Sequence, residues 1–176
     1  LNASKGIEIE VTVVFADICD FTSLSERLPP KEIVLILNKF LSSMAEVAEE
    51  HSGVIDKLMG DNVMVIFGAT GNSRNHVVSA VKAAVFMKER VKNIRIEGLQ
   101  KEKKTLSIGV GINSGKVIIG NLGSSKRMSY TVIGDTVNIA SRLQDMAKKN
   151  KILITDKVYQ RIKNITECKK IGKIAL

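Results

Sequence analysis

The sequence predicts an α+β domain in which helices pack over one face of a mostly antiparallel sheet. β-branched apolar runs of strand length alternate with longer segments of helical periodicity. In the first two-thirds of the chain the order is strand, helix, helix, strand, strand, helix, strand. This is the ferredoxin-like, split β-α-β pattern with one helix doubled. The 176 residues, 44% of them hydrophobic and 26% charged, fit a single globular domain with a substantial core.

The first predicted strand, Glu10–Ala16, is a run of apolar and β-branched residues typical of a buried strand. A turn at Asp17–Phe21 follows, and Ser23 with Glu26 resembles a capping box that starts a helix. Pro29-Pro30 ends that helix and opens a second one, because proline is tolerated in the first turn of a helix.

The second helix repeats apolar residues at helical spacing, and we expect these to face the core: Ile33, Leu37, Phe40, Met44 and Val47. Gly53 is the expected C′ residue at the end of this helix. The stretch Val54–Gly68 then predicts two short strands joined at Gly60-Asp61. Glycine at the first central position suits a type II′ turn, which leaves the carboxylate of Asp61 at the tip.

A third helix is predicted over His76–Val91, with Val77, Val81, Ala84 and Val85 facing inward. Thr105–Asn113 and Lys116–Leu122 indicate a second hairpin that turns at Ser114-Gly115. The remaining predicted elements are a strand at Tyr130–Ile133, a helix from Asp135 to about Lys148, a strand at Lys151–Thr155, a helix at Asp156–Arg161 and a strand from Glu167 onward.

Composition narrows the classes of function. The net charge of +9 favours polyanionic partners, but aromatic residues are only 4% and are not interleaved with the lysines, which argues against a nucleic-acid surface. Cys19 and Cys168 make neither a disulfide framework nor a zinc site, and no apolar run has the length of a membrane span. This use of cysteine favours a reducing, cytoplasmic setting. The chain opens with Leu1 rather than Met and shows no signal pattern, so we expect a domain excised from a longer chain with regulatory domains or a membrane anchor.

Two aspartates stand where strands end. Asp17 closes the first strand, and Asp61 occupies the hairpin turn, so both can lie at one edge of the sheet. Paired carboxylates suit two hard divalent cations, which can clamp a phosphoryl group for in-line displacement. The turn after Asp17 also offers backbone N–H groups to phosphates. The alternatives are a helix-capping aspartate and an ordinary solvated hairpin tip, and for Asp20 we prefer the capping interpretation.

Asn138 and Arg142 are four residues apart and share one face of the predicted helix. An amide beside a guanidinium suits a sugar and a phosphate that gains charge during reaction. The alternative for such a pair is a solvated helix face.

Four blocks of the sequence, in order and covering nearly the whole chain, resemble the class III nucleotidyl cyclase catalytic domain. They are FADICDFTSLSE, DKLMGDNVMVIFG, INSGKVIIGNLG and YTVIGDTVNIASRL. The resemblance implies conversion of a nucleoside triphosphate to its 3′,5′-cyclic monophosphate and pyrophosphate. By matching position, it implies that two Mg²⁺ or Mn²⁺ ions bind Asp17, Asp61 and the carbonyl of Ile18. The backbone of the turn after Asp17 is expected to bind the phosphates at Ile18, Cys19, Phe21 and Thr22.

The same resemblance assigns the purine to Lys57 and Thr131, the ribose to Asn138, and the charge at the α-phosphate to Arg142. Lysine only donates hydrogen bonds, so Lys57 suits the acceptor N1 of adenine and not the N1–H of guanine. We therefore expect ATP and an adenylate cyclase. The hydroxyl of Thr131 can donate as well as accept, so guanylate cyclase stays an alternative, as does a catalytically silent nucleotide-binding or dimerisation module. Threonine at this position resembles the bicarbonate-responsive subgroup.

In family members the metal ligands and the base-binding residues of one site come from different subunits. The resemblance therefore implies a symmetric homodimer with two composite sites, toward which the segment Lys126–Arg127 would reach. The sequence departs from the family in two ways. Gly109 stands where some relatives carry a phosphate-contacting arginine, and the chain ends at Leu176 before a terminal hairpin whose lysine contacts phosphates.

Overall fold

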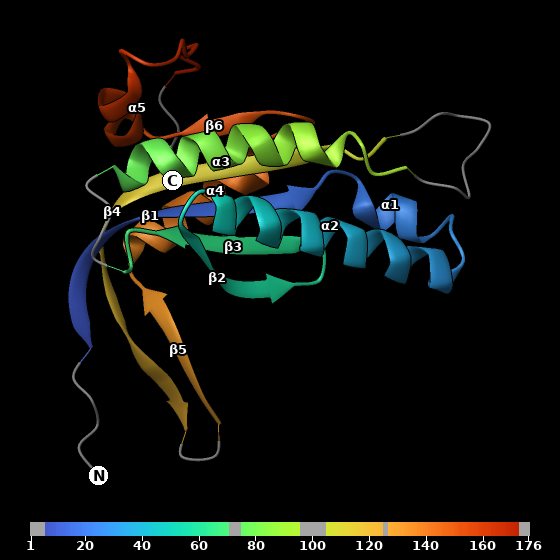
Figure 1. Cartoon of the computed structure of the whole chain (residues 1–176), viewed down its shortest axis with the longest axis horizontal. Helices are drawn as coiled ribbons and strands as arrows, with labels where there is room; N and C mark the ends of the chain where they lie inside the picture. Colours follow the sequence, from blue (N-terminus) through green and yellow to red (C-terminus); the bar gives the residue numbers. More distant parts are fainter. Residues whose placement is uncertain (1–5, 71–74, 96–104, 125–126, 173–176) are drawn as a thin grey trace.

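The computed structural model describes residues 6–70, 75–95, 105–124 and 127–172 (Figure 1). The elements follow the chain as β1 Ile7–Ile18, α1 Phe21–Ser25, α2 Pro30–Glu50, β2 Gly53–Met59, β3 Asn62–Phe67, α3 His76–Val91, β4 Ile108–Ser124, β5 Arg127–Ile133, α4 Asp135–Met146, β6 Ile152–Ile154 and α5 Asp156–Ile162. No helix in these ranges is long and apolar enough to cross a lipid bilayer.

The described strands form one sheet in the order β2-β3-β1-β4-β5, and all of these neighbours are antiparallel. β6 pairs with β4 in parallel along Val110–Ile112, whereas β5 pairs with β4 along Ile118–Ser124. The predicted α+β class and the strand–helix–helix–strand–strand–helix–strand order are confirmed. The sheet edge where β1 ends next to the β2–β3 turn is the part that positions the candidate site.

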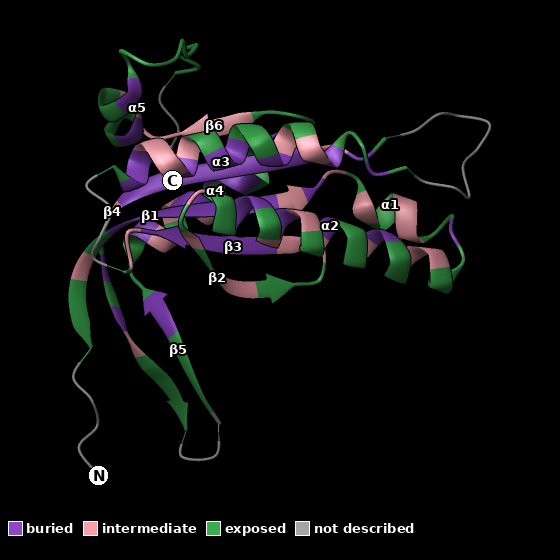
Figure 2. Ribbon diagram, in the orientation of Figure 1, coloured by how far each residue is buried: buried purple, intermediate pink, exposed green. Residues whose placement is uncertain are grey.

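Helices cover both faces of the sheet, so the prediction of a single covered face is wrong. α2, α3 and α5 pack on one face, over a core that includes Val14 and Ala16 of β1. α4 packs on the other face, over Val13 and Phe15. Every residue of β1 from Val11 to Ala16 is buried, and a strand that is apolar on both sides needs cover on both sides (Figure 2).

β4 is a single strand of 17 residues, so the predicted turn at Ser114-Gly115 is wrong. These two residues pair with Thr12 and Val11 of β1, and the buried Ser114 hydroxyl accepts a hydrogen bond from Thr12 Oγ1 at 3.2 Å. A Cβ on Gly115 would lie 2.7 Å from Thr136 Oγ1. The glycine therefore allows α4 to approach the strand closely and does not mark a turn.

The first helix starts differently from the predicted capping box. α1 begins at Phe21, so Ser23 lies inside it and Glu26 is its C-cap residue. Asp20 is the N-cap residue, as preferred from the sequence, but with φ 59° it makes no side-chain cap hydrogen bond. Its carboxylate instead pairs with Lys149.

Three smaller predictions about the rest of the chain are also wrong. α2 ends at Glu50, and Ser52, with φ 61°, takes the left-handed conformation that Gly53 was expected to take. Gly53 opens β2, where a Cβ would lie 2.7 Å from the Phe67 ring. Val85 of α3 is exposed because it lies off the buried stripe of that helix. The segment from Glu167 to residue 172 forms no strand.

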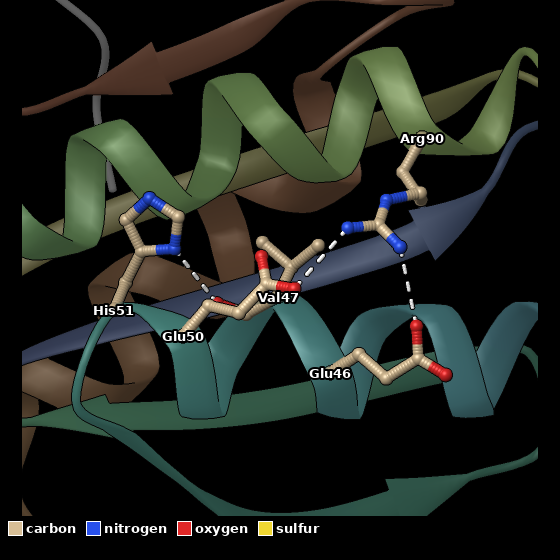
Figure 3. Close-up of polar contacts among 5 residues, drawn as sticks. All are labelled: Glu46, Val47, Glu50, His51 and Arg90. Atoms are coloured by element: carbon tan, nitrogen blue, oxygen red, sulfur yellow. Dashed lines mark hydrogen bonds and ion pairs between the residues drawn. The ribbon is translucent and has the colours of Figure 1, made fainter.

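Surface polar contacts join α2 to α3 (Figure 3). Arg90 of α3 donates to Glu46 of α2 at 3.2 Å and to Glu50 of α2 at 3.3 Å. Within the last turn of α2, the Nδ1–H of His51 donates to the carbonyl of Val47 at 2.9 Å. Exposed ion pairs of this kind contribute about 0–1 kcal/mol each. The buried side chains beneath them, Phe40, Met44, Val47, Ala80, Ala84 and Met87, therefore hold the two helices together.

The β4–β5 hairpin projects away from the body of the domain (Figure 1). We call this hairpin, Ile118–Ser124 with Arg127–Ile133, the arm. Several large apolar side chains on it are exposed: Ile118, Leu122, Met128, Tyr130 and Ile133. Tyr130 is 64% exposed, so this apolar surface finds no cover within the described chain.

Candidate active site

Asp17 and Asp61 meet at one edge of the sheet. β1 pairs with β3 so that Asp17 faces Asn62, and the N–H of Ile18 donates to the carbonyl of Asp61 at 3.2 Å. Gly60 has φ 67° and open space around the position of a Cβ, as a tight hairpin turn of the predicted kind requires. Pairing of the strand end with the turn therefore brings the two half-buried carboxylates together.

The environment raises the pKa of Asp17 from 3.8 to about 7. Burial of the carboxyl is the largest cause, followed by the negative charges of Asp61 and Asp145 and by a side-chain hydrogen bond with Asp61. A hydrogen bond from Gln144 acts in the opposite direction. Like charges placed side by side in a partly buried setting are unfavourable unless a proton or a cation lies between them.

Two neutral side chains support this edge and were not predicted. Asn62 Nδ2 donates to Gln144 Oε1 at 2.9 Å, and Gln144 is buried beside Asp17. Asn62 Oδ1 is buried and has no hydrogen-bond partner among the described residues. Asn62 and Gln144 are 82 positions apart, so no local sequence pattern could have connected them.

The donor set at this edge fits hard divalent cations. In the described parts of the chain, no group of three or more His, Cys, Asp or Glu side chains is placed to hold a metal ion. Two carboxylates are what Mg²⁺ commonly takes from a protein when substrate phosphates complete its shell. After burial, repulsion from the neighbouring carboxylates is the next cause of the raised pKa of Asp17, and a cation would relieve that repulsion.

The turn after Asp17 uses part of its backbone internally. The N–H of Ile18 donates to Asp61, and the N–H of Cys19 donates to the carbonyl of Ser107 at 2.9 Å. The N–H groups of Phe21 and Thr22 lie in the first turn of α1. A cleft of about 630 Å³ lies beside this turn, and its lining includes Cys19, Asp20, Ser23, Ser107 and Lys149. Phosphate binding at Ile18, Cys19, Phe21 and Thr22 stays a prediction.

Lys57 and Thr131 lie in contact. Lys57 Nζ donates to Thr131 Oγ1 at 2.5 Å and to Asp56 Oδ2 at 2.8 Å. Thr131 Oγ1 in turn donates to Asp56 Oδ2 at 2.7 Å. The two predicted purine-binding residues, from β2 and β5, therefore meet, and both bind Asp56. The side chain of Asp56 is only 4% exposed. Its role was not predicted from the sequence.

Asn138 and Arg142 are both exposed on α4, one turn apart. Neither side chain makes a hydrogen bond or ion pair with another described residue. α4 is held close to β4 by glycines: a Cβ on Gly111 would lie 2.2 Å from the carbonyl oxygen of Ala140, and one on Gly109 would lie 2.2 Å from that of Ala147. An arginine at 109 would therefore require the end of α4 to move. Lys126 lies outside the described residues, and Arg127 opens β5.

Comparison with known proteins gives a consistent result. Residues 5–176 match the family described as the adenylate and guanylate cyclase catalytic domain. An adenylate cyclase of Anabaena cylindrica is 37% identical over 91% of this chain, which spans 34% of that relative's length. Adenylate cyclase 1 of Rhizobium meliloti is 32% identical over 93% of the chain, which spans 25% of it.

Solved structures agree in fold. The adenylyl cyclase CyaB from P. aeruginosa superposes with a TM-score of 0.89 at 37% identity, over 98% of this chain and 89% of that one. The guanylyl cyclase Cya2 superposes with a TM-score of 0.82 at 34% identity, over 89% of this chain and 80% of that one.

Proposed function

The chain belongs to the adenylate and guanylate cyclase catalytic domain family, and we propose that it is an adenylate cyclase that converts ATP to 3′,5′-cyclic AMP and pyrophosphate. The observation that carries the proposal is the joint placement of two residue pairs. Asp17 and Asp61 form an acidic edge, and Lys57 with Thr131 forms a polar pair whose hydrogen-bond donors and acceptors can read a base.

Asp17 and Asp61, with the carbonyl of Ile18, would hold two Mg²⁺ or Mn²⁺ ions. Such ions, when bound, lower the pKa of an attacking hydroxyl and neutralise a triphosphate and its pyrophosphate leaving group. Because the pKa of Asp17 is about 7, this carboxyl keeps a proton over part of the neutral range until a cation displaces it. Metal binding should therefore release protons and strengthen with rising pH.

On α4, Asn138 would orient the ribose and Arg142 would stabilise negative charge at the α-phosphate. Both side chains are exposed and make no polar contact with other described residues, so they are available to a ligand. A guanidinium offers several N–H donors in a planar fork, which suits the crowded oxygens of a phosphate in reaction. The helix position is fixed by the close approach of α4 to Gly109 and Gly111.

We propose that the active form is a homodimer with two composite sites. The exposed apolar side chains of the arm support a second copy as the partner, because a surface of this kind is normally covered. Lys57 and Asp61 would then serve different sites although they are four residues apart. The two curated relatives are three to four times longer than the matched region, which supports a longer parent chain with regulatory domains.

Product analysis tests the proposal. The purified chain is incubated with ATP or GTP and with Mg²⁺ or Mn²⁺, and cyclic nucleotide and pyrophosphate are quantified. We expect equimolar cyclic AMP and pyrophosphate from ATP and a much slower reaction with GTP. Preference for GTP would favour the guanylate cyclase alternative. The likeness to the guanylyl cyclase Cya2 is the observation that supports this alternative. Binding of nucleotide without either product would identify a catalytically silent module.

A further inference from the structure

We propose that Asp56 fixes the proton of the Thr131 hydroxyl and thereby makes the proposed purine pocket, Asp56 with Lys57 and Thr131, select adenine over guanine. Asp56 is a specificity-determining residue in this view, and it acts through Thr131 without touching the base. The inference rests on the proposed cyclase function, because it assumes that Lys57 and Thr131 bind the purine.

A β-bulge places Asp56 in the pocket. The pairing of β2 with β3 shifts between Ile55, which faces Val65, and Lys57, which faces Met64. Successive strand residues normally point to opposite faces, but an extra residue in a bulge breaks this alternation. Asp56 and Lys57 are therefore neighbours in sequence and both reach the hydroxyl of Thr131, at 2.7 Å and 2.5 Å.

The hydrogen bonds in this pocket can be fully assigned. A carboxylate only accepts, so the contact between Asp56 Oδ2 and Thr131 Oγ1 uses the single proton of the hydroxyl. Lys57 donates to one of the two lone pairs of Thr131 Oγ1. Thr131 is left with one lone pair and no proton, so it can only accept from a bound base.

The Lys57 ammonium is constrained in the same way. It has three N–H donors, of which one goes to Asp56 and one to Thr131, so one remains for a ligand. The pocket therefore presents one donor and one acceptor side by side. Adenine offers the matching pair, an acceptor N1 and a donor amino group, whereas guanine offers a donor N1–H and an acceptor O6.

Burial keeps the Thr131 hydroxyl proton directed at Asp56. The Asp56 side chain is 4% exposed and Thr131 is 6% exposed, so water has little access to compete for the hydroxyl. A buried mismatch of donors or acceptors lowers affinity on the order of tenfold to a hundredfold. Without Asp56, the Thr131 hydroxyl could rotate and donate to O6 of guanine, and part of the discrimination would be lost.

The direct test is Asp56→Asn, which keeps the size of the side chain. Its amide can donate to Thr131 Oγ1 and so frees the hydroxyl proton for the base. We expect the ratio of kcat/KM for ATP over GTP to fall about tenfold. A role limited to supporting the fold would lower kcat/KM for both substrates by the same factor and leave the ratio unchanged, and that result would overturn the proposal.

Thr131→Val provides the matched background, because it removes the hydroxyl and keeps the shape. Alone it should also lower the ATP-to-GTP ratio about tenfold, and adding Asp56→Asn to it should change the ratio no further. If Asp56→Asn does not fold, Thr131→Val still decides, since an unchanged ratio in that variant would contradict the proposal. Thr131→Ser, which keeps the hydroxyl, should keep the wild-type ratio.

Binding measurements separate this inference from the proposed function. α,β-Methylene ATP and α,β-methylene GTP cannot be cyclised, and their dissociation constants can be measured by calorimetry for the wild type and Asp56→Asn. A wild type that makes no cyclic nucleotide but prefers the ATP analogue, with the preference lost in Asp56→Asn, would refute the enzyme and support the role of Asp56. No preference in the wild type would refute the role of Asp56.

Discussion

At the end of β1 a carboxylate lies against a second carboxylate, whereas at the contact between side chains of β2 and β5 a carboxylate lies against an ammonium and a hydroxyl. We call the first region, Asp17 with Asp61, the acidic edge, and the second, Asp56, Lys57 and Thr131, the purine pocket. At the acidic edge, burial of the carboxyl and then repulsion from Asp61 and Asp145 raise the pKa of Asp17 to about 7. In the purine pocket each short contact joins a donor to an acceptor.

In the proposed active site, this difference separates two tasks, cation binding and base recognition. Groups that receive cations are most useful when their own chain leaves their charge uncompensated, because the cation then gains the full interaction. Groups that read a base are most useful when their protons are already fixed, because a fixed pattern rejects the wrong partner. Variants of the acidic edge should therefore affect all substrates alike, whereas variants of the purine pocket should change the choice of substrate.

The largest effect is expected at the acidic edge. Asp17→Ala and Asp61→Ala should each lower cyclic nucleotide formation at least about 100-fold, with ATP and with GTP, because the cations lose a ligand. Asp145→Asn is the control, since Asp145 affects Asp17 only through its charge, and it should stay within about threefold of wild type. More than a tenth of wild-type turnover in either alanine variant would show that its carboxylate is not a metal ligand.

Mixing inactive variants tests whether the two sets of residues serve different sites. Asp17→Ala combined with Arg142→Ala should recover about a quarter of wild-type activity, because half of the randomly formed dimers contain one intact site. Asp17→Ala mixed with Asp61→Ala is the matched control and should recover nothing, since both changes affect the acidic edge. Equal recovery in the two mixtures, or none in the first, would argue against composite sites.

A smaller and selective effect is expected in the purine pocket. Lys57→Met keeps the length of the side chain and removes its donors, so kcat/KM for ATP should fall about tenfold to a hundredfold and that for GTP should fall less. Lys82→Met, at an exposed position of α3, should leave both values unchanged. If Lys57→Met lowered turnover of both nucleotides equally, the contrast between the two regions would be lost.

The smallest effect is one of stability and depends on pH. Asp17 loses its proton near pH 3.8 in the unfolded chain and near pH 7 in the folded one, so the folded state binds more protons between these values. Wild-type stability should therefore fall as the pH rises from 4 to 7. Asp17→Asn does not titrate, so its midpoint of thermal unfolding should exceed that of wild type by a few degrees at pH 8 and equal it at pH 4.

Metal ions should reverse this order. Mn²⁺ added at pH 8 is expected to raise the unfolding midpoint of the wild type and to have little effect on Asp17→Asn, because a ligand that binds only the folded state stabilises it. If Asp17→Asn were less stable than wild type at pH 8 without metal, the ionised Asp17 carboxylate would not be destabilised by burial and by its neighbouring charges.

Some of this site could be predicted from the sequence because its signals are local. The glycine before Asp61 marks a tight turn, and Asp17 ends an unmistakable buried strand, so their meeting required only that the two strands be neighbours. The pair Asn138 and Arg142 needed only helical spacing. Their catalytic roles came from resemblance and await the experiments above.

The features that could not be predicted from the sequence depend on contacts between residues far apart in the chain. Ser114-Gly115 has the composition of a turn, but pairing with β1 keeps it extended, since local turn preference is weaker than a full ladder of strand contacts. Asp56 would point away from its neighbour in a regular strand, and only the bulge brings it beside Thr131. Gln144 supports Asp17 from a helix on the second face of the sheet, a face that was expected to be bare.

The binding of Mn²⁺ measured by electron paramagnetic resonance, with α,β-methylene ATP present, tests the role of the acidic edge without requiring turnover. The account predicts two Mn²⁺ ions per chain in the wild type and a loss of at least one in Asp17→Ala, with the ATP analogue still bound through the purine pocket. Equal Mn²⁺ binding by the wild type and Asp17→Ala, or no Mn²⁺ binding by the wild type, would contradict it.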